Sequence, residues 1–352
     1  MDKPSYIRNF GMKAWVILVE LLLLVSCDNA IYDDEGDCSV TYHLKFRYDM
    51  NMKFADAFTH EVKSVRLYAF NSNGELVWQA DEQGEILASG DYTMKLELAP
   101  GDYHLMAWCG LDNGESFTVT DASHNCRMTD LHCKLNRYLD KATGVSYSNK
   151  DLHPLFHGSL DVSLPANDDG GDYTYVMPLT KDTNVFRVVL QHLSGQDINV
   201  DDFTFSIEDR NGWIAHDNTL KEEPIVYRAW STYSGEAGVD IATGKESRVT
   251  TIVKVAVAEL TVSRLVLRDW SLYSRPMLII RTTEGKLVAS IPIIDYALLV
   301  KGNYNRKMSD QEYLDRQDEY NMTFFLDEQN QWINSVILIN SWRVVLSNVD
   351  VD

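Results

Sequence analysis

The sequence is poor in basic residues, with 32 Lys and Arg against 52 Asp and Glu and a formal net charge of −20. A protein that binds nucleic acid or anionic lipid through a basic face needs an excess of positive charge there, and this composition argues against such a face. Its apolar runs are also too short for a transmembrane helix, which needs about 20 residues. We interpret the acidity as a means of keeping the chain soluble.

Common catalytic and nucleotide-binding motifs are missing as well. There is no GxSxG turn, no HExxH helix, no P-loop and no GxGxxG turn. We therefore predict a protein that is not an enzyme, with no catalytic residue, no cofactor and no metal. Small-molecule substrates are not expected either.

Two groups of residues resemble metal sites only in part. The first consists of His124, Cys126, His132 and Cys133. Zinc accepts these ligand types, but two adjacent ligands would point apart on a helix, so a disulfide or buried thiols explain them better. The second is the acidic stretch 167–172, which lacks the pattern and terminal Glu of an EF-hand and fits a solvated loop.

Aromatic residues and one histidine give further weak signals. The tryptophans are scattered among strand-like segments, which favours core packing over a sugar-binding platform; the relevant ones are Trp108, Trp213, Trp230, Trp270, Trp332 and Trp342. His157 lies at the start of a probable strand. We interpret it as a structural rather than a catalytic histidine.

The most informative residue is Cys27, which ends the run LLLLVSC at 21–27. A hydrophobic residue, Val, a small residue and then Cys form the lipobox read by the lipoprotein signal peptidase. Three basic residues precede the apolar stretch 14–25, as in a signal peptide. We predict that 1–26 is a lipoprotein signal peptide and that Cys27 carries lipid; an ordinary signal peptide ending near a cysteine is the alternative. Met12 is an alternative start to Met1.

Cysteine is otherwise scarce. The remaining ones are Cys38, Cys109, Cys126 and Cys133. Export to an oxidising compartment allows disulfides, but four cysteines permit three pairings and the sequence does not choose among them. Since four are too few for a disulfide scaffold, the fold must rest on hydrophobic cores.

Alternation of apolar and polar residues predicts strands over most of the chain. They are expected at 40–48, 65–69, 76–78, 92–98, 103–108, 156–163, 173–179, 185–191, 203–207, 250–258, 262–268, 276–282, 286–293, 321–326 and 332–346. The turns at 71–74 and 99–102 predict hairpins. Helices are expected at 127–139 and 309–320, the second with Ser309 as its cap and Glu312 completing a capping box.

This pattern predicts an all-β chain of antiparallel β-sandwich domains with a few short helices. Residues 27–38 are acidic, and we predict that they form a lipidated flexible tether. The N-terminal domain is expected at 39–181 and the C-terminal domain at 182–352, because the run 178–182 reads as a connection.

Besides the lipobox, a set of short segments is distinctive. They are EGDCSV at 35–40, FRYDMNM at 46–52, ADAF at 55–58, VRLYAF at 65–70, PGDY at 100–103, AWCGL at 107–111, LFHG at 155–158, YLDRQ at 313–317 and INSWRV at 339–344. In these segments, which follow the family's order over nearly the full length, the chain resembles the FimB/Mfa-type fimbrial anchor lipoproteins of Bacteroidetes, which are minor fimbrial subunits.

The resemblance implies two transthyretin-like β-sandwich domains in an outer-membrane-anchored subunit that tethers a pilus to the cell surface and influences its length. It also implies pilin subunits as partners, joined by donor-strand exchange, in which backbone hydrogen bonds add a strand to a sheet. Polymerising pilins lose an N-terminal strand after an Arg. Residues 28–46 contain no Arg, which fits an uncleaved anchor.

Two further expectations accompany this resemblance. Asp28 directly follows Cys27, a position that favours inner-membrane retention in enteric bacteria, whereas the acidic run 33–35 is linked to surface export in this group. The C-terminal segment 333–346 is our candidate for the pilin contact, with a plain core strand as the alternative.

A function from another class shares these features. A surface glycan-binding lipoprotein of a nutrient-uptake system would also have a lipid anchor, an acidic composition and β-sandwiches. It would differ in exposing Trp or Tyr side chains to oligosaccharide.

Overall fold

A computed structural model describes residues 40–111, 114–120, 126–166, 170–242, 248–302, 307–340 and 342–345. The lipobox, the tether, Cys38 and His124 lie outside the described residues, as do residues 167–169 of the acidic stretch 167–172. By its contacts the chain divides into a small unit, 1–41 with 166–173, and a large unit, 42–165 with 174–352, which holds the sites discussed below. None of the described helices is long and apolar enough to cross a membrane.

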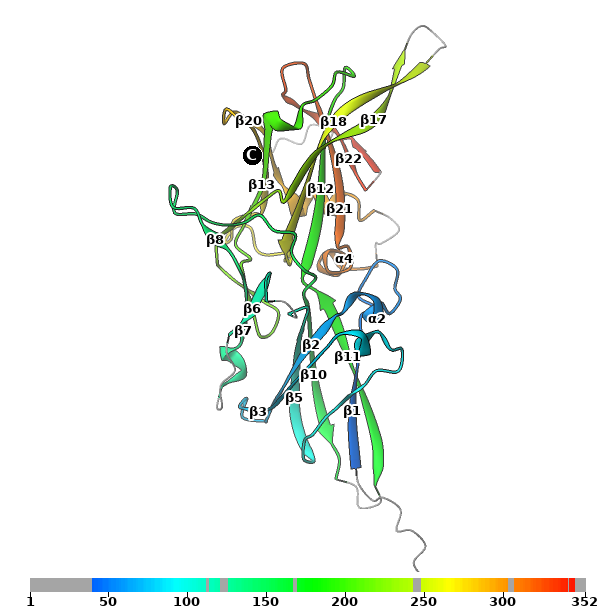
Figure 1. Ribbon diagram of the computed structural model, residues 1–352, viewed down its shortest axis with the longest axis vertical. Coiled ribbons are helices and arrows are strands. Elements are labelled where there is room, and N and C mark those ends of the chain that lie inside the picture. The colour runs from blue at the N-terminus through cyan, green and yellow to red at the C-terminus, as the bar shows by residue number, and fades with distance from the viewer. Residues whose placement is uncertain are drawn as a thin grey trace, which may run out of the picture. The chain divides into compact units, whose positions relative to one another are not determined.

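The regular secondary structure of the described chain is almost entirely β, as predicted (Figure 1). A seven-stranded sheet, sheet I, has the order β3 (Leu76–Gln83), β2 (Ser64–Phe70), β5 (Gly101–Cys109), β10 (Phe156–Leu164), β11 (Gly171–Lys181), β1 (Val40–Arg47) and β4 (Met94–Lys95). A six-stranded sheet, sheet II, has the order β17 (Ser231–Ala242), β18 (Arg248–Ser263), β12 (Thr183–His192), β21 (Glu319–Leu326), β22 (Trp332–Ile339) and β23 (Trp342–Val345).

Two further sheets combine strands from both sides of residue 181. Sheet III has the order β20 (Leu287–Pro292), β19 (Met277–Thr282), β13 (Phe203–Asp209), β16 (Ile225–Arg228), β9 (Ser146–Ser148) and β8 (Tyr138–Leu139). Sheet IV has the order β15 (Leu220–Lys221), β14 (Trp213–Ala215), β7 (His132–Leu135) and β6 (Phe117–Val119). The domain boundary at residue 181 remains a prediction, and strand pairing crosses it in both sheets.

Short helical segments connect the strands. They are the α-helices α2 (Phe58–Glu61), α3 (Ile293–Leu299) and α4 (Asp310–Arg316), and the 3₁₀ turns η1 (Glu85–Ala88), η2 (Met128–Asp130) and η3 (Val200–Asp202). The cap of α4 is confirmed, because the Ser309 hydroxyl accepts a hydrogen bond from the backbone N–H of Glu312. The Glu312 carboxylate instead accepts a hydrogen bond from Arg316, one helical turn on.

Hydrophobic packing explains the layers. Phe186 and Leu260 of sheet II lie in the same buried cluster as Phe205 and Ile280 of sheet III, so these sheets share a core as the two layers of a sandwich. Along β12, β13 and β21 buried residues alternate with more exposed ones. Strands buried on one face produce this period of two, which is why the sequence pattern located them.

Pairing is mostly antiparallel. Parallel ladders also occur among the described strands, however: β12 pairs with β21 and β16 pairs with β9. Parallel neighbours need a long connection between them. The expected fold class, an all-β sandwich with a few short helices, is confirmed, although the sheets are not purely antiparallel.

The predicted helix at 127–139 is wrong. This segment contains only the short turn η2 and then strands β7 and β8. Leu131, Cys133 and Leu135 are buried on one face, while the residues between them are half-buried. Leu131 and Leu135 suit both a helical period of about four and a strand period of two, and pairing of β7 with β6 and β14 decides for the strand.

The hairpin at 71–74 is confirmed, but the one at 99–102 is wrong. β5 pairs with β2 and β10, whereas β4 pairs with β1. Apolar alternation identifies the buried face of a strand but carries no information about its partner. The strand β18 (Arg248–Ser263) contains the strand expected at 250–258 but ends at Ser263, so the strand expected at 262–268 is wrong for residues 264–268, which begin with Arg264.

Candidate functional site

The histidine, cysteine and tryptophan residues that the sequence singled out as candidate site residues do not come together in one site. His157 is buried, its Nε2 lies 2.8 Å from the carbonyl oxygen of His216, and its ring packs edge-on against Trp108 at 4.7 Å. Burial lowers the pKa of His157 to about 4. A neutral, enclosed imidazole bonded to a backbone oxygen has a structural role, as expected.

Two of the described cysteines are core residues, whereas Cys126 is only partly buried. Cys109 and Cys133 are fully buried free thiols, and burial raises the pKa of both. A raised pKa disfavours the thiolate needed for nucleophilic attack or metal ligation. Within the described residues, no group of His, Cys, Asp or Glu is arranged to hold a metal ion.

The tryptophans do not form one platform. Trp108 is completely buried, whereas Trp213, Trp230, Trp270 and Trp332 are half-buried and belong to different segments. Trp230 donates from Nε1 to the Thr261 hydroxyl at 3.2 Å. Trp342 lies in β23, where side chains are not described.

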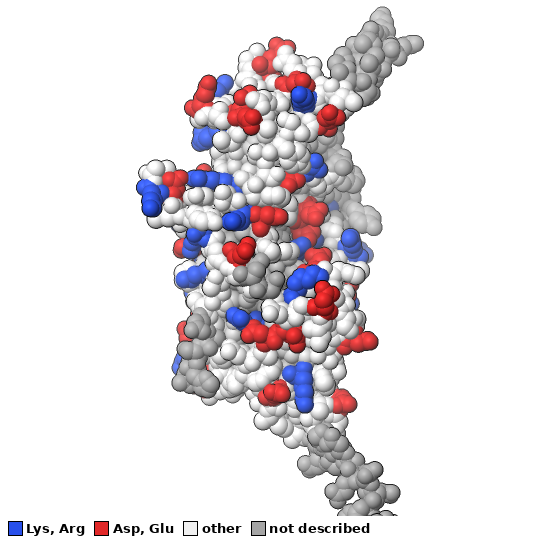
Figure 2. All heavy atoms as spheres, viewed as in Figure 1, with Lys and Arg blue, Asp and Glu red and all other residues white. Residues whose placement is uncertain are grey.

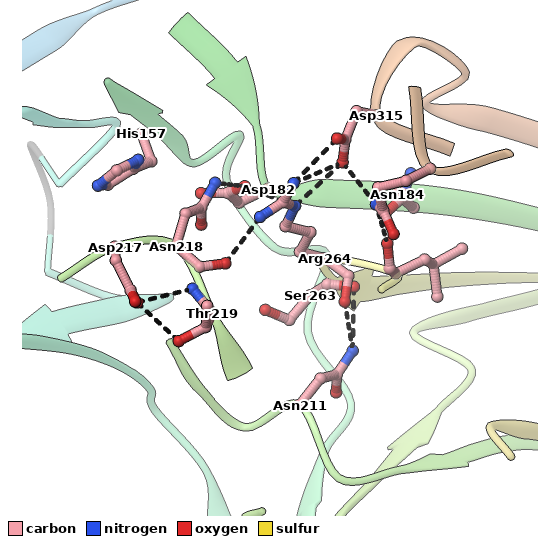
Figure 3. Close-up of polar contacts among 12 residues, drawn as sticks. His157, Asp182, Asn184, Asn211, Asp217, Asn218, Thr219, Ser263, Arg264 and Asp315 are labelled. Atoms are coloured by element: carbon pink, nitrogen blue, oxygen red, sulfur yellow. Dashed lines mark hydrogen bonds and ion pairs between the residues drawn. The ribbon is translucent and has the colours of Figure 1, made fainter. Parts of the chain in front are cut away.

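A buried polar cluster lies where β11 of sheet I continues into β12 of sheet II. We call it the Asp182 junction; its members are Asp182, Asn218, Arg264 and Asp315, which converge in Figure 3. Arg264 donates from Nη2 to both carboxylate oxygens of Asp315, each at 2.9 Å, and from Nη1 to the Asn218 carbonyl at 2.7 Å. Sequence reasoning missed this cluster.

Asp182 is the residue of this junction most removed from water. Its side chain has no exposed area, one oxygen accepts from the Asn218 amide at 3.0 Å, and Arg264 lies 3.6 Å away. The other oxygen has no hydrogen-bond partner in the described part of the chain. Burial raises the pKa of Asp182 to about 7, although Arg264 and Asn218 lower it in part. Arg264 compensates incompletely because it is already bonded to Asp315.

The charged groups around this junction also join the two halves of the chain. Lys181 Nζ bonds to Glu61 at 3.0 Å and to Asp318 at 2.7 Å. Burial alone would lower the pKa of Lys181, but these two carboxylates raise it overall. Arg316 donates to the backbone oxygen of Asp49 at 2.9 Å. These contacts are structural, since Asp182 and Lys181 are too enclosed to meet a substrate.

The edge strands of the sheets offer a different kind of site. β3 ends sheet I, and β17 and β23 end sheet II. An end strand has backbone N–H and C=O groups that another strand can pair with. In the candidate contact segment 333–346, β22 pairs on both sides, with β21 and β23, so β23 is the part that ends the sheet. The chain turns between them at Asn340, which has a positive φ of 47°.

Acidic and basic side chains are interspersed on the face in Figure 2. A groove at the border of sheet I is lined by residues 80–82 of β3 and by residues 93–95 around β4, with Tyr92 between aliphatic and acidic neighbours. The two end strands of sheet I thus border the same groove.

Comparison with known proteins agrees with this architecture. The family model of fimbrillin-A-associated anchor proteins Mfa1 and Mfa2 matches residues 34–348. A putative adhesin from Bacteroides thetaiotaomicron is 35% identical, with a TM-score of 0.73 over 88% of this chain and 98% of that chain. No curated protein sequence matches significantly.

Two further solved structures are similar. Putative polysaccharide-binding proteins from B. thetaiotaomicron give 29% identity and a TM-score of 0.72, over 88% of this chain and 99% of that chain. The fimbrial anchor protein Mfa2 from Porphyromonas gingivalis gives 14% identity and a TM-score of 0.63, over 88% of this chain and 100% of that chain, a likeness of fold. Because the family model spans most of the sequence, this chain belongs to the fimbrillin-A-associated anchor proteins Mfa1 and Mfa2, a family of fimbria-associated proteins of the cell surface.

Proposed function

We propose that this chain is a non-enzymatic outer-membrane lipoprotein, anchored through lipid on Cys27, that tethers a fimbria to the cell and influences its length. The match to the anchor family over residues 34–348 is the observation that carries the proposal. The lipobox at Cys27 supports it, because acyl chains attached there would hold the protein at a membrane. More than one acyl chain makes such attachment stable.

We further propose that pilin subunits bind through strand pairing. The end strands β3, β17 and β23 support this mode, in which backbone hydrogen bonds supply affinity and alternate side chains supply specificity. β23 is the preferred contact, because it ends sheet II and belongs to the C-terminal segment 333–346.

Replacing Cys27 by Ala should move fimbriae from the cell to the medium, because the fibre loses its lipid attachment. Cell-bound and shed fimbriae would be quantified by electron microscopy and immunoblotting of the native strain. Cys38→Ala is the matched control: it removes a cysteine outside the lipobox and should leave the fimbriae on the cells. Fimbriae that stay attached at normal length in the Cys27→Ala strain would contradict the anchor proposal.

Deleting residues 342–352 should abolish co-purification of pilin while leaving the protein exported and folded. The deletion removes β23 but keeps Ile337 and Ile339 of β22, which are both fully buried. A shorter deletion of 346–352 retains β23 and serves as the control. Pilin recovered equally with both truncated proteins would argue against β23 as the contact.

A second candidate function is glycan binding at the cell surface. The observation that favours it is the 29% identity to structures described as putative polysaccharide-binding proteins. Oligosaccharide binding by the purified protein, together with fimbriae unaffected in the Cys27→Ala strain, would favour this function over the anchor.

A further inference from the structure

Sheet IV presents an unusual row of side chains on its solvent-exposed face. In the ladder, Trp213 of β14 lies directly opposite Lys221 of β15 on one side and Lys134 of β7 on the other. Residues that are directly opposite one another project from the same face of a sheet. Lys221 is exposed, and Lys134 and Trp213 are half-buried, so the row is accessible to solvent.

Contacts with Trp213 and His132 hold the two lysine ammonium groups of this row in place. Lys134 Nζ lies 3.8 Å and Lys221 Nζ 5.1 Å from the centre of the Trp213 ring. His132, two residues before Lys134 on the same face, packs edge-on against Trp213 at 5.0 Å. Lys221 Nζ lies 3.3 Å from His132 Nε2, so the ammonium donates to a neutral imidazole. We call Lys134, Lys221, Trp213 and His132 the Trp213 surface.

This surface carries positive charge without a carboxylate partner. None of the ion pairs between described residues includes Lys134 or Lys221, although acidic residues greatly outnumber basic ones in the chain. Burial and then the Lys221 ammonium lower the pKa of His132, a backbone hydrogen bond at Leu131 raises it in part, and the Lys134 ammonium lowers it further. An ammonium group is attracted to the face of an aromatic ring, but it binds an anion more strongly through charge-assisted hydrogen bonds.

We propose that the Trp213 surface binds an acidic glycan through its carboxylate or sulfate groups. Two ammonium groups beside one indole offer charge-assisted hydrogen bonds to the anion and an apolar ring edge to the sugar. β7 and β14 pair with strands on both sides, so the backbone at the centre of this surface cannot accept a peptide strand. The net charge of −20 disfavours nucleic acid. This inference is independent of the anchor proposal.

The test is calorimetric titration of the purified full-length protein with four probes. They are oligogalacturonate, which carries carboxylates; a heparin oligosaccharide, which carries sulfates; neutral maltohexaose; and hexaglutamate. We expect at least one acidic oligosaccharide to bind and maltohexaose not to bind. Which of the two binds identifies the anionic group.

Variants then locate the binding. Lys134→Gln and Lys221→Gln should each weaken binding about tenfold, since a hydrogen bond to a charged group contributes about 1.5–3 kcal/mol and 1.4 kcal/mol corresponds to a factor of ten. Lys286→Gln removes the same charge from an exposed turn in sheet III and should change nothing. Melting temperatures confirm that all variants are folded.

Three results would overturn the proposal. They are no binding of either acidic oligosaccharide, binding that the Lys134→Gln/Lys221→Gln double variant retains, and hexaglutamate binding as tightly as the glycans at the same lysines. The last result would assign the surface to an acidic peptide. A loss of pilin anchoring has no bearing here, so failure of this proposal and failure of the anchor proposal are distinguishable.

Discussion

Replacing Gly110 by Ala is expected to destabilise the protein by about 3 kcal/mol or more, since left-handed backbone costs a non-glycine residue about 1–2 kcal/mol and overpacking about 1–3 kcal/mol. Gly110 follows β5 with a φ of +90°, and an added Cβ would lie 1.9 Å from the backbone oxygen of Pro154. Backbone atoms cannot swing aside as a side chain can. The free energy of unfolding would be measured by urea denaturation, followed by tryptophan fluorescence.

Gly74→Ala provides the matched control for this substitution. Gly74 also has a positive φ, +75°, but no atom lies within 4 Å of an added Cβ. It should therefore show the conformational penalty alone, about 1–2 kcal/mol. An equal decrease in the free energy of unfolding for both variants would show that the backbone near Pro154 moves aside at little cost, and would refute the steric argument.

Replacing Arg264 by Leu should destabilise the protein by about 3–5 kcal/mol, the usual effect of removing one partner from a buried ion pair. The substitution leaves the carboxylates of Asp182 and Asp315 close together without their shared cation. It also removes the donor to the Asn218 carbonyl. Chemical denaturation at neutral pH measures the loss, and a loss below about 1 kcal/mol would contradict it.

The pH dependence distinguishes this explanation from simple loss of packing. The pKa of Asp182, about 7 in the folded protein, lies above its ordinary value of 3.8. The folded state therefore binds more protons than the unfolded state between these values, and Asp182 lowers stability as pH rises through that window. The Arg264→Leu defect should shrink as pH falls, and Asp182→Asn in the same background should restore part of the stability.

An Arg264→Leu defect that is constant from pH 4 to 8 would mean that Asp182 is not the uncompensated charge. The single variant Asp182→Asn supplies the second control. It should flatten the wild-type stability profile between pH 4 and 7, because the group that titrates there is gone.

Local patterns in the sequence predicted the parts of the fold that depend on neighbours in the chain. The turn at 71–74 and the cap at Ser309 each involve residues a few positions apart, and both are present. Burial on one face also identified β12 and β13. At 127–139 the same reasoning failed, because the apolar spacing suited two periods and pairing with β14, distant in sequence, decided between them.

The Asp182 junction was out of reach for the same reason. Asp182 lies in a run that resembles a solvated connection, and its burial depends on Asn218, Arg264 and Asp315. The Trp213 surface also depends on pairing between distant strands. In the sequence, His132 resembles a zinc ligand together with His124 and two cysteines, and no local pattern marks Lys134 or Lys221 as part of a site.

Sheets III and IV, which combine strands from both sides of residue 181, have a mechanical consequence. Strands β7 and β9, which precede residue 181, pair with β14 and β16, which follow it. Tension between an N-terminal attachment and a C-terminal load would reach these ladders as well as the single covalent crossing at Asp182. Pulled from its ends, the protein should yield in one large rupture event, in which the ladders and the junction break together, rather than as two modules that extend in turn.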